Sequence, residues 1–511
     1  MITLKANKMK LYITALLLLM LVTSCSKDFL KEDPKSSLTP DNFYKTADDL
    51  NMAAIALYTQ VNGAFNQSGG FSTLWGGDDM TVARAGNKIS YSDFDTYQAT
   101  SSNDRMTNWW SYFYATIKSS NSLLSNYQNA TAASEDDRNH AAGQAYFFRA
   151  LSYFFLTRTW GKVPLITDNK VDYSRTKAEP SEIYTLIVAD LQKAETMLPD
   201  AWDGTKRQNG VDIPPTRGSA KALLANVYLT MAGWPLKQTD KYALAAAKAK
   251  EVIDNKAAWG YELTTNFADL WKKTGKFNHE TVFGCYYNVN VSGWAWENYN
   301  MLTPNAYAPD DEGGWGDGYG EINFYKKFPP GPRKEATYQS VYYINNDPGN
   351  AVDWTKTQHK HPYFFKFRDD DAFNPVNHVN NNWIGSHTVF VIRYAEVLLT
   401  YAEAQAMSAS PDATAYTAIN QVRNRSGIAD LVGGLSQTAF RDSVIAERGW
   451  EFAGVEPAAR WYDLIRTETV GKANSDRDAS EETLKSIPDD ASHTFYWAPI
   501  PIGDQQLNPN L

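Results

Sequence analysis

The chain has 511 residues, a formal net charge of −9 and only two cysteines, Cys25 and Cys285. A chain of this length can bury a large core without disulfide bonds, which excludes a small disulfide-stapled scaffold. The acidic balance argues against nucleic acid as a partner and against docking on anionic phospholipid, because like charges repel.

The first 24 residues are typical of a secretory signal peptide. Three lysines precede an apolar block over residues 11–22, and small polar residues follow it. The block is about a dozen residues long, whereas a helix that crosses a bilayer needs roughly 20. Residues 11–22 are therefore a poor membrane span, and removing the signal takes the net charge from −9 to −12.

The signal ends in Val22-Thr23-Ser24-Cys25, which resembles the lipobox of bacterial lipoproteins. That resemblance implies cleavage before Cys25 and acylation of its thiol, which would anchor a soluble body to a membrane. The alternative is a plain signal with an incidental cysteine. With Cys25 acylated, Cys285 has no partner for an internal disulfide. Residues 25–40 are polar and proline-punctuated, and we interpret them as a tether.

Helical patterns dominate the chain after the tether. Ser134 and Asp137 have the spacing of a capping box and open a helix that runs to about Trp160. Apolar residues recur at helical spacing from Pro180 until Pro199 stops them. Further helices are predicted over residues 217–232, 242–254, 391–407, 413–425 and 438–452. No comparable series of strands is visible, so the predicted fold class is mostly α.

Two predicted helices share a pattern of two alanines and a tyrosine, at Ala145, Ala150 and Tyr153 in one and at Ala220, Ala225 and Tyr228 in the other. Recurring small and aromatic positions are typical of tetratricopeptide-like helix pairs, which form a curved scaffold. The matches are 75 residues apart, so the repeats must be interrupted. We expect one body over residues 41–511, with helical repeats over about 105–258 and 390–453.

Residues 259–389 differ from the rest of the chain. Gly, Pro, Asn, Asp and aromatic residues are frequent there, and the helical periodicity fades. Long stretches of this kind in a compact domain are usually functional, because loops on a rigid scaffold carry binding groups. We therefore expect the ligand face in this insert and in the loop over residues 65–108.

Eight segments of the chain resemble the SusD/RagB family of nutrient-binding outer-membrane lipoproteins of Bacteroidetes, in the family's order. The segments are SLTPDNFYKTADDL, FFRALSYFFLTRTWGKVPLI, EIYTLIVADLQKAETMLP, TRGSAKALLANVYLTMAG, VIRYAEVLLTYAEA, AINQVRNRSG, ERGWEFAGVEPAARWYDLIRT and FYWAPIPIGDQQLNPNL. Two departures lie near the C-terminus: the chain ends at Leu511, earlier than many relatives, and Val455–Ala458 replaces a tighter Glu-Gly-x-Arg pattern.

The resemblance implies a helical scaffold whose loops present a ligand. It implies capture of oligosaccharide, or of peptides in some branches, for a SusC-like TonB-dependent transporter, with no catalysis. It also implies a lipid-anchored protein on the outer membrane, facing the cell exterior, and residues 26–28 somewhat resemble the signal that sends such lipoproteins outward. No cofactor, metal or nucleic acid is expected.

A sugar-binding site needs exposed aromatic rings, which stack on the C–H faces of the sugar, and polar side chains, which form hydrogen bonds with its hydroxyl groups. Trp294 and Trp296 would share one face of an extended segment. Glycines surround the other aromatic candidates, with acidic and basic residues nearby, which predicts uncovered rings. The full set of predicted ligand-binding residues is Trp75, Asp79, Arg84, Trp294, Trp296, Trp315 and Tyr319. For each aromatic candidate the alternative is a packed or turn-stabilising ring.

Other kinds of site fit the sequence less well. The glycines from Gly314 to Gly320 lack the spacing of a phosphate loop and lie among acids that would repel phosphate. The acidic runs 310–312 and 369–371 do not match a calcium loop and are expected to be solvated. His359 and His361 are expected to be a surface pair. A glycoside hydrolase would need two carboxylates at a set separation, but no catalytic motif is visible, so enzymatic activity is the least favoured alternative.

Overall fold

The computed structural model describes residues 39, 42–66, 76–84, 86–288, 309–312, 314–366, 373–374, 379–380, 388–454, 456, 459–481 and 488–511. Helices dominate this part of the chain, which confirms the predicted fold class. The principal helices are α2 (Ala47–Phe65), α4 (Asp104–Asn126), α5 (Glu135–Trp160), α6 (Pro180–Met197), α7 (Arg217–Ala232), α8 (Lys241–Asp254), α12 (Tyr394–Ser408), α13 (Ala413–Arg425) and α14 (Gln437–Glu451).

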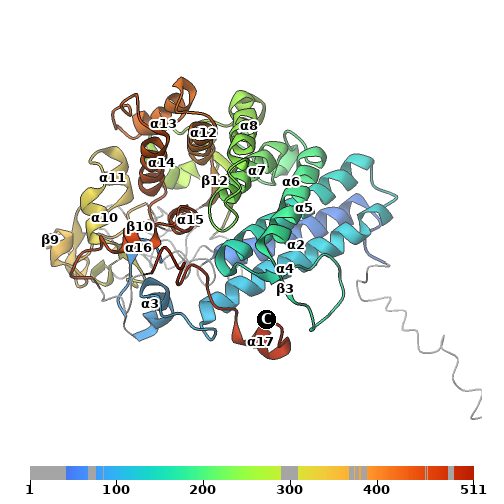
Figure 1. Ribbon diagram of the computed structural model, residues 1–511, viewed down its shortest axis with the longest axis horizontal. Helices are drawn as coiled ribbons and strands as arrows, with labels where there is room; N and C mark the ends of the chain where they lie inside the picture. The colour runs from blue at the N-terminus through green and yellow to red at the C-terminus, as the bar shows by residue number, and fades with distance from the viewer. Residues whose placement is uncertain are drawn as a thin grey trace, which may run out of the picture.

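These helices lie side by side in one continuous array, from α2, α4 and α5 on the right of Figure 1 to α13 and α14 at the upper left. Consecutive helices pack together, and α8 packs directly against α12 although the insert separates them in sequence. The alanines and tyrosines of the shared pattern are buried in α5 and α7. Small residues at these positions let neighbouring helices approach closely, as the sequence predicted.

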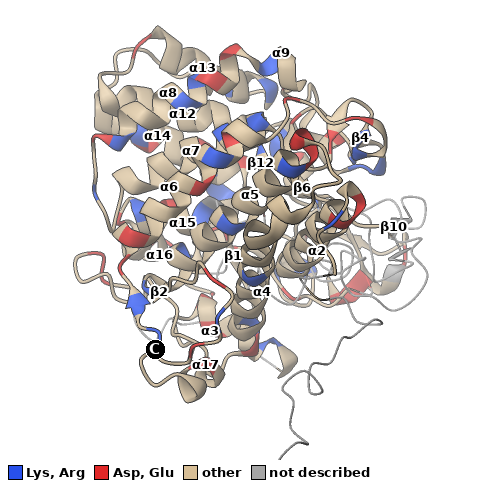
Figure 2. Ribbon diagram, turned by 90° about the vertical axis from the view of Figure 1, so that its right-hand side faces the viewer, with Lys and Arg blue, Asp and Glu red and all other residues tan. Residues whose placement is uncertain are grey.

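Local signals set most helix ends where they were predicted. At the start of α5, the Asp137 backbone N–H donates to Ser134 Oγ at 3.0 Å, and the Ser134 N–H donates back to the Asp137 carboxylate at 3.2 Å. This is the predicted capping box. Helix α6 has Pro180 in its first turn and ends two residues before Pro199. Charged residues of both signs lie next to each other along α6 and α7 (Figure 2).

One predicted helix begins later than expected. Residues 391–393 belong not to α12 but to strand β12 (Val389–Arg393), which pairs antiparallel with β6 (Thr281–Cys285). All five residues of β12 are buried, and a continuous apolar run of this length fits a buried strand as well as a helix. The pairing partner lies over 100 residues away, so local periodicity does not reveal it.

The insert contains short elements joined by loops. In its described part, the α-helices are α10 (Ile322–Lys327) and α11 (Pro332–Thr337). Other short helices of the chain are α3 (Ile89–Asp95), α9 (Lys256–Trp259), α15 (Ala459–Arg466), α16 (Val470–Asn474) and α17 (Ile502–Leu507). The remaining strands form two-residue pairs: β1 (Met80–Thr81) with β7 (Tyr319–Gly320), β2 (Val163–Pro164) with β3 (Lys177–Ala178), β4 (Arg207–Gln208) with β5 (Val211–Asp212), β8 (Tyr342–Tyr343) with β9 (Ala351–Val352), and β10 (Phe373–Asn374) with β11 (Val379–Asn380).

A network of buried charges joins the insert to the end of the helical array. Arg333 of α11 donates to the Glu451 carboxylate of α14 at 2.8 Å, and Arg393 at the end of β12 donates to it at 2.7 Å. Arg425 of α13 reaches Glu451 and also Glu280, at 2.9 Å. Each side chain is at most 4% exposed. The network fixes the insert, and with it the loops that it carries, against a rigid scaffold.

Within the described ranges, no helix combines the length and the apolar character that a membrane crossing requires.

Candidate functional site

The two segments in which the sequence places the ligand site lie side by side. Met80 of β1 pairs with Gly320 of β7, and Thr81 pairs with Tyr319. The Glu321 backbone N–H adds a bond to the Asp79 carbonyl at 3.2 Å. We call the surface formed by residues 76–97 and 309–366 the loop face. Segments from both predicted site regions therefore contribute to one surface.

Trp315 is the described aromatic candidate that reaches the surface of the loop face. Its ring is half-buried and packs against a small second core. The buried members of that core are Met80, Val82, Tyr91, Phe324, Phe328, Tyr338, Phe364 and Ala453. The Trp315 side chain is thus held by packing and is partly accessible to solvent, and an aromatic ring held in this way can stack on a sugar ring.

Charged residues flank the backbone on both sides of Trp315. His359 Nε2 lies 2.9 Å from Asp310 Oδ2, and Lys88 contacts the buried Asp317 carboxylate. The hydrogen bond with His359 lowers the pKa of the Asp310 carboxyl, so Asp310 stays an acceptor at neutral pH. Burial lowers the pKa of the Lys88 amine, an effect that the Asp310 charge opposes. The segment that carries Trp315 is therefore flanked by fixed hydrogen-bond donors and acceptors.

Gly316 makes this arrangement possible. Its φ of +54° lies in the left-handed region that glycine adopts without strain. A Cβ at this position would lie 2.7 Å from Asp310 Oδ2 and 3.4 Å from His359 Nε2. The absence of a side chain thus allows the Asp310–His359 pair to approach the loop that carries Trp315.

Tyr319 does not have the uncovered ring that its glycine neighbours predicted. The side chain is buried, and its ring stacks on His359 at a centroid distance of 5.3 Å and lies against His361 at 4.4 Å. Pairing between β1 and β7 directs Tyr319 into a cluster with Tyr342 and Tyr363. The prediction of an open sugar-binding face at Tyr319 is therefore wrong.

Asp79 is also buried rather than available at the surface. Its Oδ2 accepts the Gly454 backbone N–H at 2.8 Å, and the residue is 1% exposed. Burial, reinforced by the charge of Asp78, raises the pKa of Asp79 to about 7. Arg84, by contrast, is exposed and forms an ion pair with Asp93 at 2.8 Å within its own segment. Of the two predicted polar residues, only Arg84 is placed where a ligand can reach it.

Asp79→Asn is expected to stabilise the protein at alkaline pH. The folded-state pKa lies above the ordinary value of 3.8, so the contribution of Asp79 to stability is greatest below pH 4 and is lost as pH rises through about 7. Asparagine keeps an acceptor for Gly454 and does not ionise, which gives a gain on the order of 3 kcal/mol at pH 8. Denaturant unfolding between pH 4 and 8 measures this effect.

The control for that experiment is Asp430→Asn, at an exposed loop position. We expect its unfolding curves to follow those of the unchanged protein at every pH. Equal stability of Asp79→Asn and the unchanged protein at pH 8 would contradict the proposed ionisation.

The remaining predicted site residues, Trp75, Trp294 and Trp296, lie outside the described residues, as does the lipidation candidate Cys25. The acidic run 369–371 lies outside them as well.

The structure also differs from the predictions of a solvated Glu312 and a surface-exposed His361. Glu312 is buried rather than solvated, and it accepts from Gln339 at 3.0 Å and from the Tyr343 N–H at 2.7 Å. His361 is buried too and lies 3.0 Å from Glu481, so only His359 of the predicted surface pair is partly accessible. Across the described ranges, no three His, Cys, Asp or Glu residues are grouped as a metal ion would require.

Sequence reasoning did not predict that Lys88 and His359 contact the segment that carries Trp315. Lys88 lies in the loop over residues 65–108, where the site was expected, but nothing in its local sequence distinguishes it from other surface lysines. Its partner Asp317 is 229 residues away, and His359 is 49 residues from Asp310. Only the folded chain brings these residues together.

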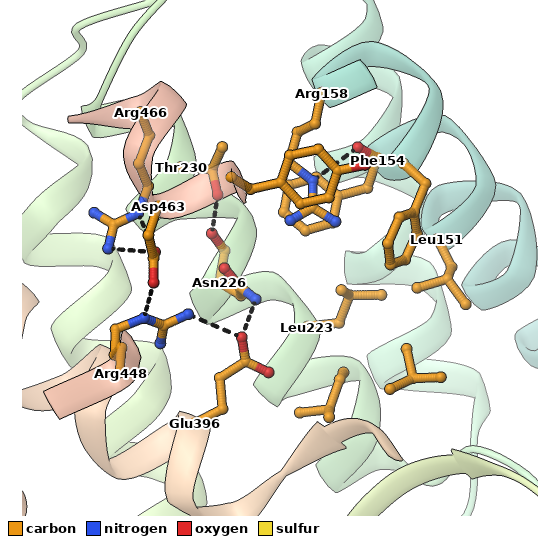
Figure 3. A pocket seen from close by; sticks show the side chains of 14 residues that line it. Leu151, Phe154, Arg158, Leu223, Asn226, Thr230, Glu396, Arg448, Asp463 and Arg466 are labelled. Atoms are coloured by element: carbon orange, nitrogen blue, oxygen red, sulfur yellow. Dashed lines mark hydrogen bonds and ion pairs between the residues drawn. The ribbon is translucent and has the colours of Figure 1, made fainter. Parts of the chain in front are cut away.

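The interior cavity shown in Figure 3 is a poor candidate for a ligand site. It has a volume of about 20 Å³, which is room for roughly one water molecule. Arg448 donates to Asp463 at 2.6 Å and to Glu396 at 3.3 Å, and Asp463 also accepts from Arg466 at 2.8 Å. Glu396, Arg448, Asp463 and Arg466 thus bind one another, and the fifth charged residue of the lining, Arg158, lies over the rings of Phe154 and Tyr462. The role of these residues is to join the surrounding helices, α12, α14 and α15 among them.

Comparison with known proteins matches two family models to this chain. The model described as "SusD family" matches residues 247–511, which is more than half of the chain. A second model, described as "Starch-binding associating with outer membrane", matches residues 28–229.

Individual relatives agree with these matches. A SusD-like protein of Bacteroides ovatus is 28% identical over 87% of this chain and 80% of its own length. A solved SusD homologue from Bacteroides thetaiotaomicron is 23% identical, with a TM-score of 0.78 over 94% of this chain and 99% of that chain. A solved laminarin-binding SusD-like protein is 27% identical, with a TM-score of 0.72 over 91% and 98% of the two chains.

A family model that covers more than half of the residues, together with a fold shared along nearly the whole chain, shows that this protein belongs to the SusD family.

Proposed function

We propose that this protein is a glycan-binding lipoprotein of the outer membrane, which captures oligosaccharide and passes it to a SusC-like TonB-dependent transporter. The observation that carries the proposal is the loop face, where half-buried Trp315 lies in sequence between Asp310 and Asp317, which pair with His359 and Lys88. An aromatic ring beside fixed polar groups matches the C–H patches and hydroxyls of a sugar.

The relatives support the same class of ligand. The solved SusD-like protein at 27% identity binds laminarin, and one matching family model is described as starch-binding and associated with the outer membrane. The proposal is one of binding and delivery, without chemical change to the glycan. Acylation of Cys25 would hold the body at the membrane, and the tether would let it move over its transporter.

Trp315→Ala is expected to weaken glycan binding by about tenfold or more, because buried aromatic contacts dominate binding energies at such sites. Affinity electrophoresis in gels that contain laminarin or another bound glycan measures the change. Trp315→Phe retains a ring face and is expected to restore most of the affinity.

The matched control is Trp497→Ala, which removes a half-buried indole that packs on Trp234, outside the loop face. Circular dichroism checks that each variant is folded. If Trp315→Ala binds glycan as tightly as Trp497→Ala and the unchanged protein do, the ligand does not contact Trp315 and the proposed site is wrong.

A further inference from the structure

A groove of about 360 Å³ lies among α10, α14, α15 and α16, apart from the polar pairs beside Trp315. These four helices lie in the left half of Figure 1. Its volume falls within the usual range for small-molecule sites, toward the lower end. Sugar-sized ligands of one or two rings fit such a space. The sequence predicted α14 as a helix but did not single out any of its residues for binding.

One wall of the groove is an apolar face of α14. Ile445, Ala446 and Trp450 line it, and all three are half-buried. Trp450 packs on the second core that also supports Trp315, so its ring is held in place. No described residue accepts a hydrogen bond from the Trp450 indole N–H. The wall thus offers a fixed aromatic surface and an available donor.

The floor of the groove is a forked ion pair. Arg460 Nε and Nη2 donate to the two carboxylate oxygens of Asp78 at 2.5 and 2.7 Å. Both side chains remain partly accessible, at 13% and 15%. Gly449 of α14 makes room for them, because a Cβ there would lie 3.1 Å from Arg460 Nη1. A glycine inside a helix costs about 1 kcal/mol relative to alanine, and here it leaves the floor open.

The charges that line the groove do not balance. Three of its four cations are paired with its three carboxylates: Arg460 with Asp78, Lys327 with Asp476 at 3.1 Å, and Arg441 with Asp442 at 2.7 Å. The fourth, Lys472, is exposed and forms no ion pair with any described residue. The Lys472 backbone N–H donates to the Asp490 carboxylate at 2.9 Å, but the Lys472 amine itself remains without an acidic partner among the described residues. The residues that line the groove therefore carry one more positive charge than negative charges.

From these observations we propose that the groove is a second saccharide site, which binds a sugar residue that carries one negative charge. Trp450 would stack on the ring, the Arg460–Asp78 fork would bind hydroxyls, and Lys472 would bind the carboxylate of a uronate or a sulfate ester. A lysine acts as a point charge and accommodates either group. The proposal rests on the proposed function in that the ligand is a saccharide, and it adds the charge of that saccharide.

Calorimetric titration of the purified mature protein tests the proposal. The probes are oligosaccharides of matched length that are neutral, uronate-bearing or sulfated. Lys472→Gln is expected to weaken binding of an anionic probe by about three- to tenfold at low salt and to leave the neutral probe unchanged. Lys472→Arg retains the charge and is expected to retain the affinity. Lys118→Gln, at an exposed position on α4, is the control.

Ala446→Trp supplies an independent test, because it fills the groove without removing any packed side chain. It is expected to abolish the tighter binding of the anionic probe in a folded protein. The difference between the uronate and sulfate probes identifies the acidic group.

The outcomes separate this proposal from the previous one. If neutral glycans bind in a Trp315-dependent manner while Lys472→Gln and Ala446→Trp change nothing, the groove proposal alone is wrong. If no saccharide binds, both proposals are wrong. If an acidic peptide binds in the groove in place of the anionic sugars, the assignment to a saccharide is overturned.

Discussion

Glu451→Ala is expected to destabilise the folded protein by about 3–5 kcal/mol, the usual cost of removing one partner from a buried ion pair. Glu451 is fully buried and accepts hydrogen bonds from Arg333 at 2.8 Å and from Arg393 at 2.7 Å, with Arg425 as a third contact. Removing its carboxylate leaves the guanidinium groups of Arg333, Arg393 and Arg425 buried without one of the negative charges that balance them. Denaturant unfolding at neutral pH measures the loss.

The buried carboxylate of Glu451 is also expected to make the stability of the protein depend on pH. Burial alone would raise the pKa of Glu451, but the charges of Arg425, Arg393 and Arg333 outweigh that effect and hold it well below its ordinary value of 4.5. The stability that this carboxylate supplies is therefore complete above pH 4.5 and is lost as pH falls toward the lowered pKa. The gap in stability between the unchanged protein and Glu451→Gln should shrink on acidification.

The matched control is Glu335→Ala, which removes an exposed carboxylate from α11, the helix that also carries Arg333. We expect a change within about 0.5 kcal/mol, as for most surface substitutions. An effect of Glu451→Ala as small as that of the control would show that the network does not hold the insert on the scaffold.

Cys25→Ala is expected to remove the protein from the outer-membrane fraction. Acyl chains on this cysteine supply the proposed membrane affinity, about 0.8 kcal/mol per buried CH₂, and stable anchoring takes more than one chain. Without them we expect at least about a tenfold drop in the membrane-bound share. Fractionation of cells, with the mass of the N-terminal peptide as a readout of acylation, measures both effects.

Ser36→Ala is the control for this experiment, because it changes a polar residue of the tether outside residues 26–28 and leaves the thiol in place. Its distribution should match that of the unchanged protein. A Cys25→Ala protein that still sediments with the outer membrane would contradict the lipid anchor.

Helices and their ends were the most predictable part of the fold. The predicted boundaries of α7 and α13 match the observed ones because caps, periodicity and stop signals are local. The start of α12 was missed because β12 pairs with a strand over 100 residues away. The buried charges at Arg393 and Glu451 were not foreseen either, because a charged residue in a helical pattern usually faces water. The burial of Glu280 was not foreseen because its partners Arg393 and Arg425 lie more than 100 residues away in sequence.

The candidate site was predictable only as a region. The insert and the loop over residues 65–108 do meet, as expected, and Trp315 is partly accessible. Tyr319 and Asp79 were misjudged because what covers them comes from distant sequence: His359 lies 40 residues after Tyr319, and Gly454 lies 375 residues after Asp79. Composition shows where aromatic and acidic residues gather, but tertiary contacts decide which of them reach the surface.

Calorimetric titration of the purified mature protein against a panel of polysaccharides and oligosaccharides, with peptides of similar length alongside, tests the central claim most directly. We predict saturable binding to at least one glycan, no binding to the peptides, and no rise in reducing ends during the titration. Binding to peptides without binding to any glycan, or release of reducing ends from the bound glycan, would contradict the proposed function.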